Sequence, residues 1–141
     1  MVLVEEYAHA GQIGERLDRA GTGWAFMSGA NRPERARTMA DFRSGKVKVA
    51  IMTRIGNVGI DVKEIDRLVV ASGGLKKSTA VQKAGRLVRS RPDKKEAVLY
   101  DCLDHGVYEK GVPKAKRFLE RHFEQRVAAY EGEGFDVEAL R

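Results

Sequence analysis

Cysteine is almost absent from this sequence, and long hydrophobic runs are absent altogether. Cys102 is the single cysteine of the 141 residues, so no internal disulfide can form and we expect an intracellular, reducing location. No apolar run approaches the roughly 20 residues that cross a bilayer. Residues 1–6 lack a basic stretch followed by a long apolar one, so they do not resemble a signal peptide. The sequence therefore predicts a protein that is neither secreted nor embedded in a membrane.

Two parts of a complete ATPase are also missing. ATP hydrolysis needs a phosphate-binding loop with its lysine and a carboxylate for magnesium. The nearest string, Gly73 to Ser78, has Lys76 where the second glycine of such a loop must stand, and no adjacent Asp-Glu pair occurs in the sequence. The three histidines are scattered and have no cysteine partners, which argues against a zinc site: His9, His105 and His122. We do not expect this chain to hydrolyse ATP alone.

Basic charge is concentrated in one segment. The net charge is +6, but residues 76–95 hold eight basic residues and one acid, so the rest of the chain sums to about −1. Such a block indicates contact with phosphates, from a nucleotide or from a nucleic acid backbone. The alternative is a solvated basic face.

Short apolar runs alternate with helical patterns along the chain. Strands are predicted at 2–4, 24–27, 47–52, 68–71 and 97–102, and helices at 10–20, 31–45, 80–89 and from 113 onward. Alternation of this kind predicts an α/β domain of three layers with a mainly parallel central sheet. We place the main domain at 1–112 and a helical extension, packed on it, at 113–141. Cys102, in an apolar strand, is expected in the core. Because the chain opens on a core strand, we expect it to be cut or split from a longer polypeptide.

The first loop with binding chemistry follows the third predicted strand. Ligands of such sheets bind where loops leave the carboxyl ends of strands. Gly56 and Gly59 would let the backbone approach a ligand closely, Thr53 offers a hydroxyl, and Asp61 offers a carboxylate suited to a ribose. A plain turn, in which the glycines supply unusual backbone angles and Asp61 caps the next segment, explains the same residues.

The second candidate is the segment from Gln82 to Arg89. Arg86 and Arg89 are three residues apart and share one face of a helix, where two guanidinium groups repel each other unless an anion lies between them. A triphosphate is such an anion, and arginine matches it with two-point hydrogen bonds. Gly85 costs the helix about 1 kcal/mol relative to alanine, which suggests a close approach. The alternative is a solvated helix face with arginines lying over apolar neighbours.

Together the two segments resemble the C-terminal RecA-like domain of superfamily 2 helicases. Residues 53–61 look like motif V, and residues 82–89 look like motif VI, whose common form is Gln-Arg-x-Gly-Arg-x-x-Arg. Lys83 stands where arginine is usual, and Val88 replaces the glycine of DEAD-box proteins, which argues against that branch. The opening strand and helix are similar to motif IV, and residues 28–53 resemble the family's run through an arginine-rich helix into motif V. Phage and repair-type translocases, with a role in DNA repair or recombination, are the nearest kind.

The resemblance implies roles for these residues. Arg89 would be the arginine finger, supported by Arg86; the nucleotide would be bound by Gln82, Asp61 and Gly59; the nucleic acid backbone would meet Thr53, Arg54 and Gly56. ATP with Mg²⁺ would be shared with an N-terminal RecA-like domain, on the same or a separate chain, in the cytoplasm or, for a phage protein, in the host cytoplasm.

Two other functions remain open on the sequence. The chain could be a free-standing module that binds nucleic acid or a partner protein, or an unrelated α/β domain whose basic helix holds a phosphorylated metabolite. The choices between DNA and RNA, between the two strand polarities, and between unwinding, annealing and remodelling are open too, as are the oligomeric state and the purpose of the last helix.

Overall fold

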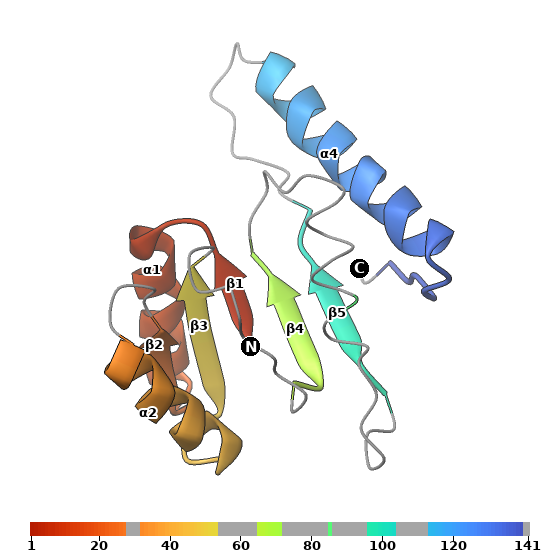
Figure 1. Cartoon of the computed structure of the whole chain (residues 1–141). Helices are drawn as coiled ribbons and strands as arrows, with labels where there is room; N and C mark the ends of the chain where they lie inside the picture. Colours follow the sequence, from red (N-terminus) through yellow and green to blue (C-terminus); the bar gives the residue numbers. More distant parts are fainter. Residues whose placement is uncertain (28–31, 54–64, 72–84, 86–95, 104–112, 140–141) are drawn as a thin grey trace.

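A computed structural model describes residues 1–27, 32–53, 65–71, 85, 96–103 and 113–139, with side chains of the last helix described from Glu120 onward. The elements follow the order strand, helix, strand, helix, three strands and a long helix (Figure 1). Their bounds are β1 (Val2–Val4), α1 (Tyr7–Arg19), β2 (Trp24–Met27), α2 (Arg32–Arg43), β3 (Val49–Thr53), β4 (Arg67–Val70), β5 (Val98–Asp101) and α4 (Pro113–Gly132).

The five strands that the structure describes form one sheet in the order β2-β3-β1-β4-β5, with every neighbouring pair parallel. β1 is central: Val4 pairs with Thr53 of β3, and Leu3 pairs with Val70 of β4. The connection from β1 leads towards the β2 edge, whereas the connection from β4 leads towards the β5 edge. The strand order therefore reverses beside β1, which is where sheets of this type bind ligands.

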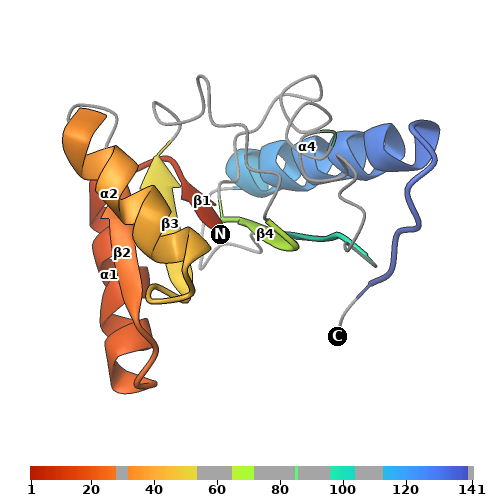
Figure 2. The same ribbon diagram turned by 60° about the horizontal axis from the view of Figure 1, so that its bottom comes forward.

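Helices cover both faces of the sheet. On one face, Val2, Val4 and Ile51 pack with Ala10 of α1. On the other, the core joins strand residues such as Met27 and Met52 to Met39 of α2 and Tyr130 of α4. Both ribbon views place α1 and α2 beside the β2–β3 end of the sheet and α4 beside the β4–β5 end (Figures 1 and 2). The predicted three-layer α/β fold with a parallel sheet is confirmed.

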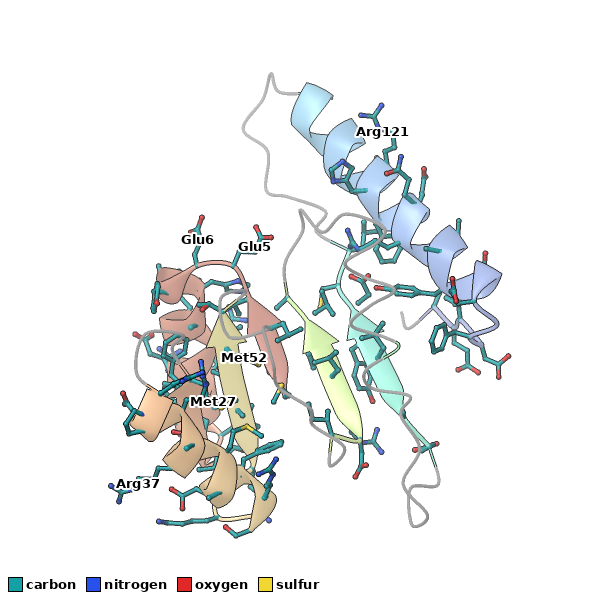
Figure 3. The ribbon with its side chains drawn as sticks, viewed as in Figure 1. Glu5, Glu6, Met27, Arg37, Met52 and Arg121 are labelled. Carbon is teal, nitrogen blue, oxygen red and sulfur yellow. The ribbon has the colours of Figure 1, made fainter. Side chains whose placement is uncertain are left out.

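Alternation along the strands explains this division. Side chains of a strand point to opposite faces in turn, so Leu3 enters one core while Val2 and Val4 enter the other. Figure 3 shows Met27 and Met52, which are register partners on β2 and β3 and are 1% and 2% exposed. Nearly continuous apolar strands are what a parallel sheet buried on both sides requires.

Several predicted boundaries shift by a few residues. α1 begins at Tyr7, earlier than expected, directly after the extended Glu6, whose carbonyl accepts a hydrogen bond from the Ala10 amide at 3.2 Å. α2 is followed by Gly45 at φ 76°, a left-handed conformation that glycine adopts without strain. β3 begins at Val49 rather than Val47, whose amide instead donates to the Asp41 carbonyl.

The last strand and last helix bring one correction and one addition. Cys102 lies after β5 and is exposed, so its predicted place in the core is wrong. α4 begins at Pro113 as predicted, and it buries Tyr130, which is 5% exposed. The same helix also buries Arg126, only 1% exposed, which an apolar-stripe pattern does not anticipate. The division into 1–112 and 113–141 stays a prediction.

Candidate functional site

The carboxyl edge of the sheet is the candidate site. Because all strands are parallel, β1, β3, β4 and β5 end at this edge, at Val4, Thr53, Val70 and Asp101. Val4 is opposite Thr53 and Val70 is opposite Asp101, so these ends form one row across the sheet. Both loops with binding chemistry belong to connections that start here, one after β3 and the other between β4 and β5.

Thr53 is the one predicted site residue within the described part of the chain. Its side chain is 2% exposed, and its Oγ1 atom has no hydrogen-bond partner among the residues that the structure describes. A buried polar group without a partner costs about 1–3 kcal/mol, so a hydroxyl kept in this state calls for an explanation. It fits a ligand-binding edge, since a ligand or its ordered water could supply the missing partner.

The remaining predicted residues lie outside the described part of the chain. They are Arg54, Gly56, Gly59 and Asp61 after β3, and Gln82, Arg86 and Arg89 between β4 and β5. Their assignment as nucleotide or nucleic acid contacts stays a prediction. Gly85, between them in sequence, is described: it is helical, exposed, and has open space where a Cβ would stand.

Two arginines at the start of α2 were not named from the sequence. Arg32 is exposed and Arg35 is half-buried, and no described residue forms an ion pair with either. α2 follows β2, so its first turn is directed towards the carboxyl edge. Glu34 lies in the same first turn, so Arg32, Glu34 and Arg35 together place one net positive charge at the positive end of the helix dipole, where an anion is favoured. The arginine-rich helix noted within residues 28–53 was the sequence signal that could have named them.

A buried charged cluster lies at the end of β5. Arg126 Nε donates to Asp101 Oδ2 at 2.7 Å, and Arg126 Nη2 donates to Asp101 Oδ1 at 2.9 Å. The Tyr130 hydroxyl donates to Asp101 Oδ2 at 2.9 Å, and Arg126 lies over the Phe123 ring. Burial, followed by the charge and the hydrogen bond of Asp101, raises the pKa of Tyr130 well above its usual range. These satisfied bonds attach α4 to the sheet.

Neighbouring groups do not form a nucleophile or a metal centre. Partial burial and then the Asp101 charge raise the pKa of the Cys102 thiol, which disfavours a reactive thiolate. Over the segments that the structure describes, no three His, Cys, Asp or Glu side chains gather as metal ligands. Over the same segments, none of the helices combines the length and apolar character of a membrane crossing.

Comparison with known proteins relates this chain to helicases. Residues 2–91 match the helicase conserved C-terminal domain. A putative DNA 3'-5' helicase, Rad25, of Halobacterium salinarum is 35% identical over 91 residues, which are 63% of this chain and 14% of that protein. The ATP-dependent DNA helicase MPH1 of Kluyveromyces lactis is 30% identical over 93 residues, 62% of this chain and 9% of that protein. The putative helicase 22 of a Sulfolobus islandicus filamentous virus is 22% identical over 125 residues, 87% of this chain and 22% of that protein.

Solved structures share the fold at lower identity. The C-terminal domain of the DEAD-box protein Dbp5 has a TM-score of 0.66 and is 24% identical, over 97% of this chain and 70% of that one. The C-terminal part of the Fun30 ATPase domain has a TM-score of 0.62 and is 12% identical, over 96% of this chain and 48% of that one. The chain spans less than a quarter of each curated relative named above. Sheet order, domain match and fold agree, and the chain belongs to the family of helicase conserved C-terminal domains, with their RecA-like fold.

Proposed function

We propose that this chain is the second motor domain of an ATP-dependent superfamily 2 helicase or translocase that acts on DNA. The observation that carries the proposal is the parallel sheet whose strand order reverses beside β1, with both ligand-type loops in connections that start at that edge. The family match over residues 2–91 supports it, and the curated relatives that are named as DNA helicases favour DNA over RNA.

ATP with Mg²⁺ would be held between this domain and an N-terminal RecA-like domain. The partner domain would supply the phosphate-binding loop and the magnesium carboxylate, which this sequence lacks. From this chain, Asp61 and Gly59 would meet the ribose side of the nucleotide and Gln82 would bridge the two domains. Arg89, supported by Arg86, would neutralise charge that develops on the transferred phosphoryl group, an effect worth about 10³–10⁵ in rate.

Nucleic acid would be held through its backbone at the same edge. Thr53, Arg54 and Gly56 would make contacts there. Arg32 and Arg35 at the start of α2, which form no ion pair with a described residue, supply positive charge in suitable positions. Contacts of this kind are salt-sensitive and carry little sequence information. Closure of the two domains on ATP and reopening after hydrolysis would move the protein along the strand.

The test uses the complete enzyme, with its N-terminal motor domain. Arg89→Ala is expected to abolish DNA-stimulated ATPase activity while thermal stability and DNA binding persist. Arg19→Ala is the control, because Arg19 is exposed on α1 and pairs only weakly with Glu15 at 3.8 Å. Full activity of Arg89→Ala would remove the arginine-finger role.

A free-standing module that binds nucleic acid is the second candidate. The observation that favours it is the pair Arg32 and Arg35 of α2, which have no ion-pair partner among the described residues. This module would bind oligonucleotides tightly as an isolated chain, with no change on Arg86→Ala or Arg89→Ala. The motor domain, in contrast, would bind weakly alone and gain affinity when joined to its partner domain.

A further inference from the structure

Tyr7, the first residue of α1, presents its ring to solvent. Of the large hydrophobic residues in the described part of the chain, two are exposed: Tyr7 at 56% and Val137 at 43%. Tyr7 directly follows the loop at the carboxyl end of β1, which is the central strand. An exposed aromatic ring on an ordered element is a surface on which a second flat ring can stack.

The ring of Tyr7 is supported from one side. Its centroid lies 5.4 Å from the ring centroid of Phe26 on β2, and the two ring planes are inclined at 58°. Tilted aromatic pairs at this separation attract each other beyond the effect of the area that they bury. Phe26 itself packs, half-buried, against the core cluster that contains Ala10 of α1. The orientation of the Tyr7 ring is therefore fixed by its contact with the sheet.

The helix leaves open space beside the same ring. A helical side chain lies over the turn that precedes it, so a side chain at position 11 is placed to cover Tyr7. Position 11 is a glycine, and a Cβ at this position would meet no atom within 4 Å. Glycine makes an exposed helix position less stable than alanine would. Gly11 therefore weakens α1 and leaves the ring of Tyr7 accessible.

Tyr7 lies close to the carboxyl end of β3. Its partner Phe26 pairs with Ile51, and Thr53 follows Ile51 by two residues, about 7 Å along the strand. Because side chains alternate along a strand, Thr53 shares the sheet face of Ile51 and Phe26. Val4, three residues before Tyr7, pairs with Thr53. A strand whose backbone lies at Thr53 would thus reach the ring within about two stacked nucleotides of 3.4 Å each.

The charges next to Tyr7 favour a base over a phosphate at this point. Glu5 and Glu6 precede Tyr7, are exposed, and point away from the sheet (Figure 3). Their carboxylates repel a phosphate group at short range. A nucleobase is uncharged and presents a flat π surface, so it can stack on a tyrosine ring beside these carboxylates.

We propose that Tyr7 is a stacking platform for one base of the nucleic acid strand whose backbone is held at the carboxyl edge. The inference rests on the proposed nucleic acid function and adds a contact with a base to it. Stacking on an aromatic side chain is open to every base, because each base has a π face. The contact therefore adds affinity without sequence specificity. It also selects single-stranded nucleic acid, because the bases of a duplex are already stacked on each other.

The test measures the binding of fluorescent single-stranded DNA to the complete enzyme. One oligonucleotide carries bases, and a second of the same length consists of abasic sites. Tyr7→Leu removes the aromatic face but keeps an apolar residue of high helix propensity, and it should lower affinity for the first oligonucleotide by about 5- to 100-fold. Affinity for the abasic oligonucleotide and the salt dependence of binding should stay at the wild-type level, because no phosphate contact is lost. Tyr7→Phe keeps the ring and should bind as the wild type does.

A second variant covers the ring of Tyr7 instead of removing it. Gly11→Leu places a side chain in the open space beside Tyr7, so it should keep or raise the melting temperature. It should nevertheless lower affinity for the oligonucleotide with bases, and leave affinity for the abasic one unchanged. The control Val137→Ala removes the other exposed large hydrophobic side chain, which lies after α4, and should change neither affinity.

The outcomes separate this inference from the proposed function. If the complete enzyme binds single-stranded DNA and Tyr7→Leu keeps wild-type affinity for both oligonucleotides, the stacking platform is overturned while the proposed function stands. An equal loss of affinity for both oligonucleotides would show that the ring supports the backbone contact or the partner domain, which also overturns the platform. If the wild-type enzyme binds duplex DNA alone, only the stacking inference fails. If it binds neither form of DNA, the proposed function fails together with this inference.

Discussion

Arg126 of α4 and Asp101 of β5 form a buried, two-point ion pair, with side chains 1% and 8% exposed. Both carboxylate oxygens of Asp101 accept hydrogen bonds. Oδ1 accepts one from Arg126 Nη2, and Oδ2 accepts one from Arg126 Nε and one from the Tyr130 hydroxyl. Taking two charges out of water costs several kcal/mol per ion, so such a pair is kept only where its geometry and extra hydrogen bonds compensate. The pair connects the last helix to the last strand and makes α4 part of the packed structure.

Removing one partner of this ion pair should lower the free energy of unfolding far more than replacing the whole Asp101–Arg126–Tyr130 cluster with apolar residues. Arg126→Met leaves the Asp101 carboxylate buried and uncompensated, and we expect the free energy of unfolding to fall by about 3–5 kcal/mol. The variant Arg126→Met/Asp101→Leu/Tyr130→Phe leaves no buried polar side chain in the cluster and should recover most of that loss. Urea denaturation followed by circular dichroism measures both. A single variant within 1 kcal/mol of wild type would mean that the pair is open to solvent.

Alkaline pH should destabilise the protein partly through Tyr130. Burial and the adjacent Asp101 raise the pKa of Tyr130 above its usual value near 10, so the folded state holds this proton more tightly than the unfolded state does. Stability from this group is therefore complete below about pH 10 and falls above it, by at most about 1.4 kcal/mol per pH unit. Tyr130→Phe should show a shallower fall in unfolding free energy between pH 10 and 11.

The control for that measurement is Tyr7→Phe, since Tyr7 is 56% exposed. Its unfolding free energy should depend on pH as the wild type's does. Equal pH dependence of Tyr130→Phe and wild type would show that Tyr130 does not hold its proton in the folded state.

The sequence was sufficient to predict the fold because the spacing of apolar residues indicates which positions of a strand or helix are buried. Runs such as Val2–Val4 and Trp24–Met27 are strands in the structure, and Gly45 ends α2 through its left-handed backbone. Strand ends were less predictable: the apolar run continues into Cys102, whose amide still donates to the Val70 carbonyl at 3.4 Å, but its thiol is exposed. Hydrophobicity alone does not reveal which side chain at the end of a strand is exposed to solvent.

The site was predictable only where it resembles a family motif. The loops around Asp61 and Arg89 were recognised from their order and spacing, and their geometry stays a prediction. The pairing of Asp101 with Arg126 was not predicted, because residues 25 positions apart on a strand and a helix meet only through tertiary packing. A charged residue in an otherwise apolar helical stripe was the one available signal.

Two glycines of α1 should respond oppositely to alanine. A Cβ at Gly14 would overlap the indole ring of Trp24, which is held by a 2.8 Å hydrogen bond from its Nε1 to Asp18. At Gly11 there is open space. Gly14→Ala should therefore destabilise by about 1–3 kcal/mol through overpacking, whereas Gly11→Ala should stabilise by up to about 1 kcal/mol through helix propensity. Thermal melting compares them, and equal stabilisation by both would contradict the close contact of α1 with β2.

Variants of Thr53 can test whether a residue at the carboxyl edge lowers the stability of the fold while it supports activity. Its hydroxyl is buried with no hydrogen-bond partner in the described part of the chain, and valine has nearly the same shape. Thr53→Val should therefore raise the free energy of unfolding by about 1–3 kcal/mol, because an unsatisfied buried polar group is removed.

The same change should lower DNA-stimulated ATPase activity in the complete enzyme if the hydroxyl meets a ligand during the cycle. Thr53→Ser keeps the hydroxyl and loses a methyl group, so it should be slightly less stable than wild type and retain activity. This opposite ordering of stability and activity separates a binding role from a packing role. A Thr53→Val protein that is less stable than both wild type and Thr53→Ser would show that the hydroxyl has a structural partner, and the argument for a ligand at this position would fail.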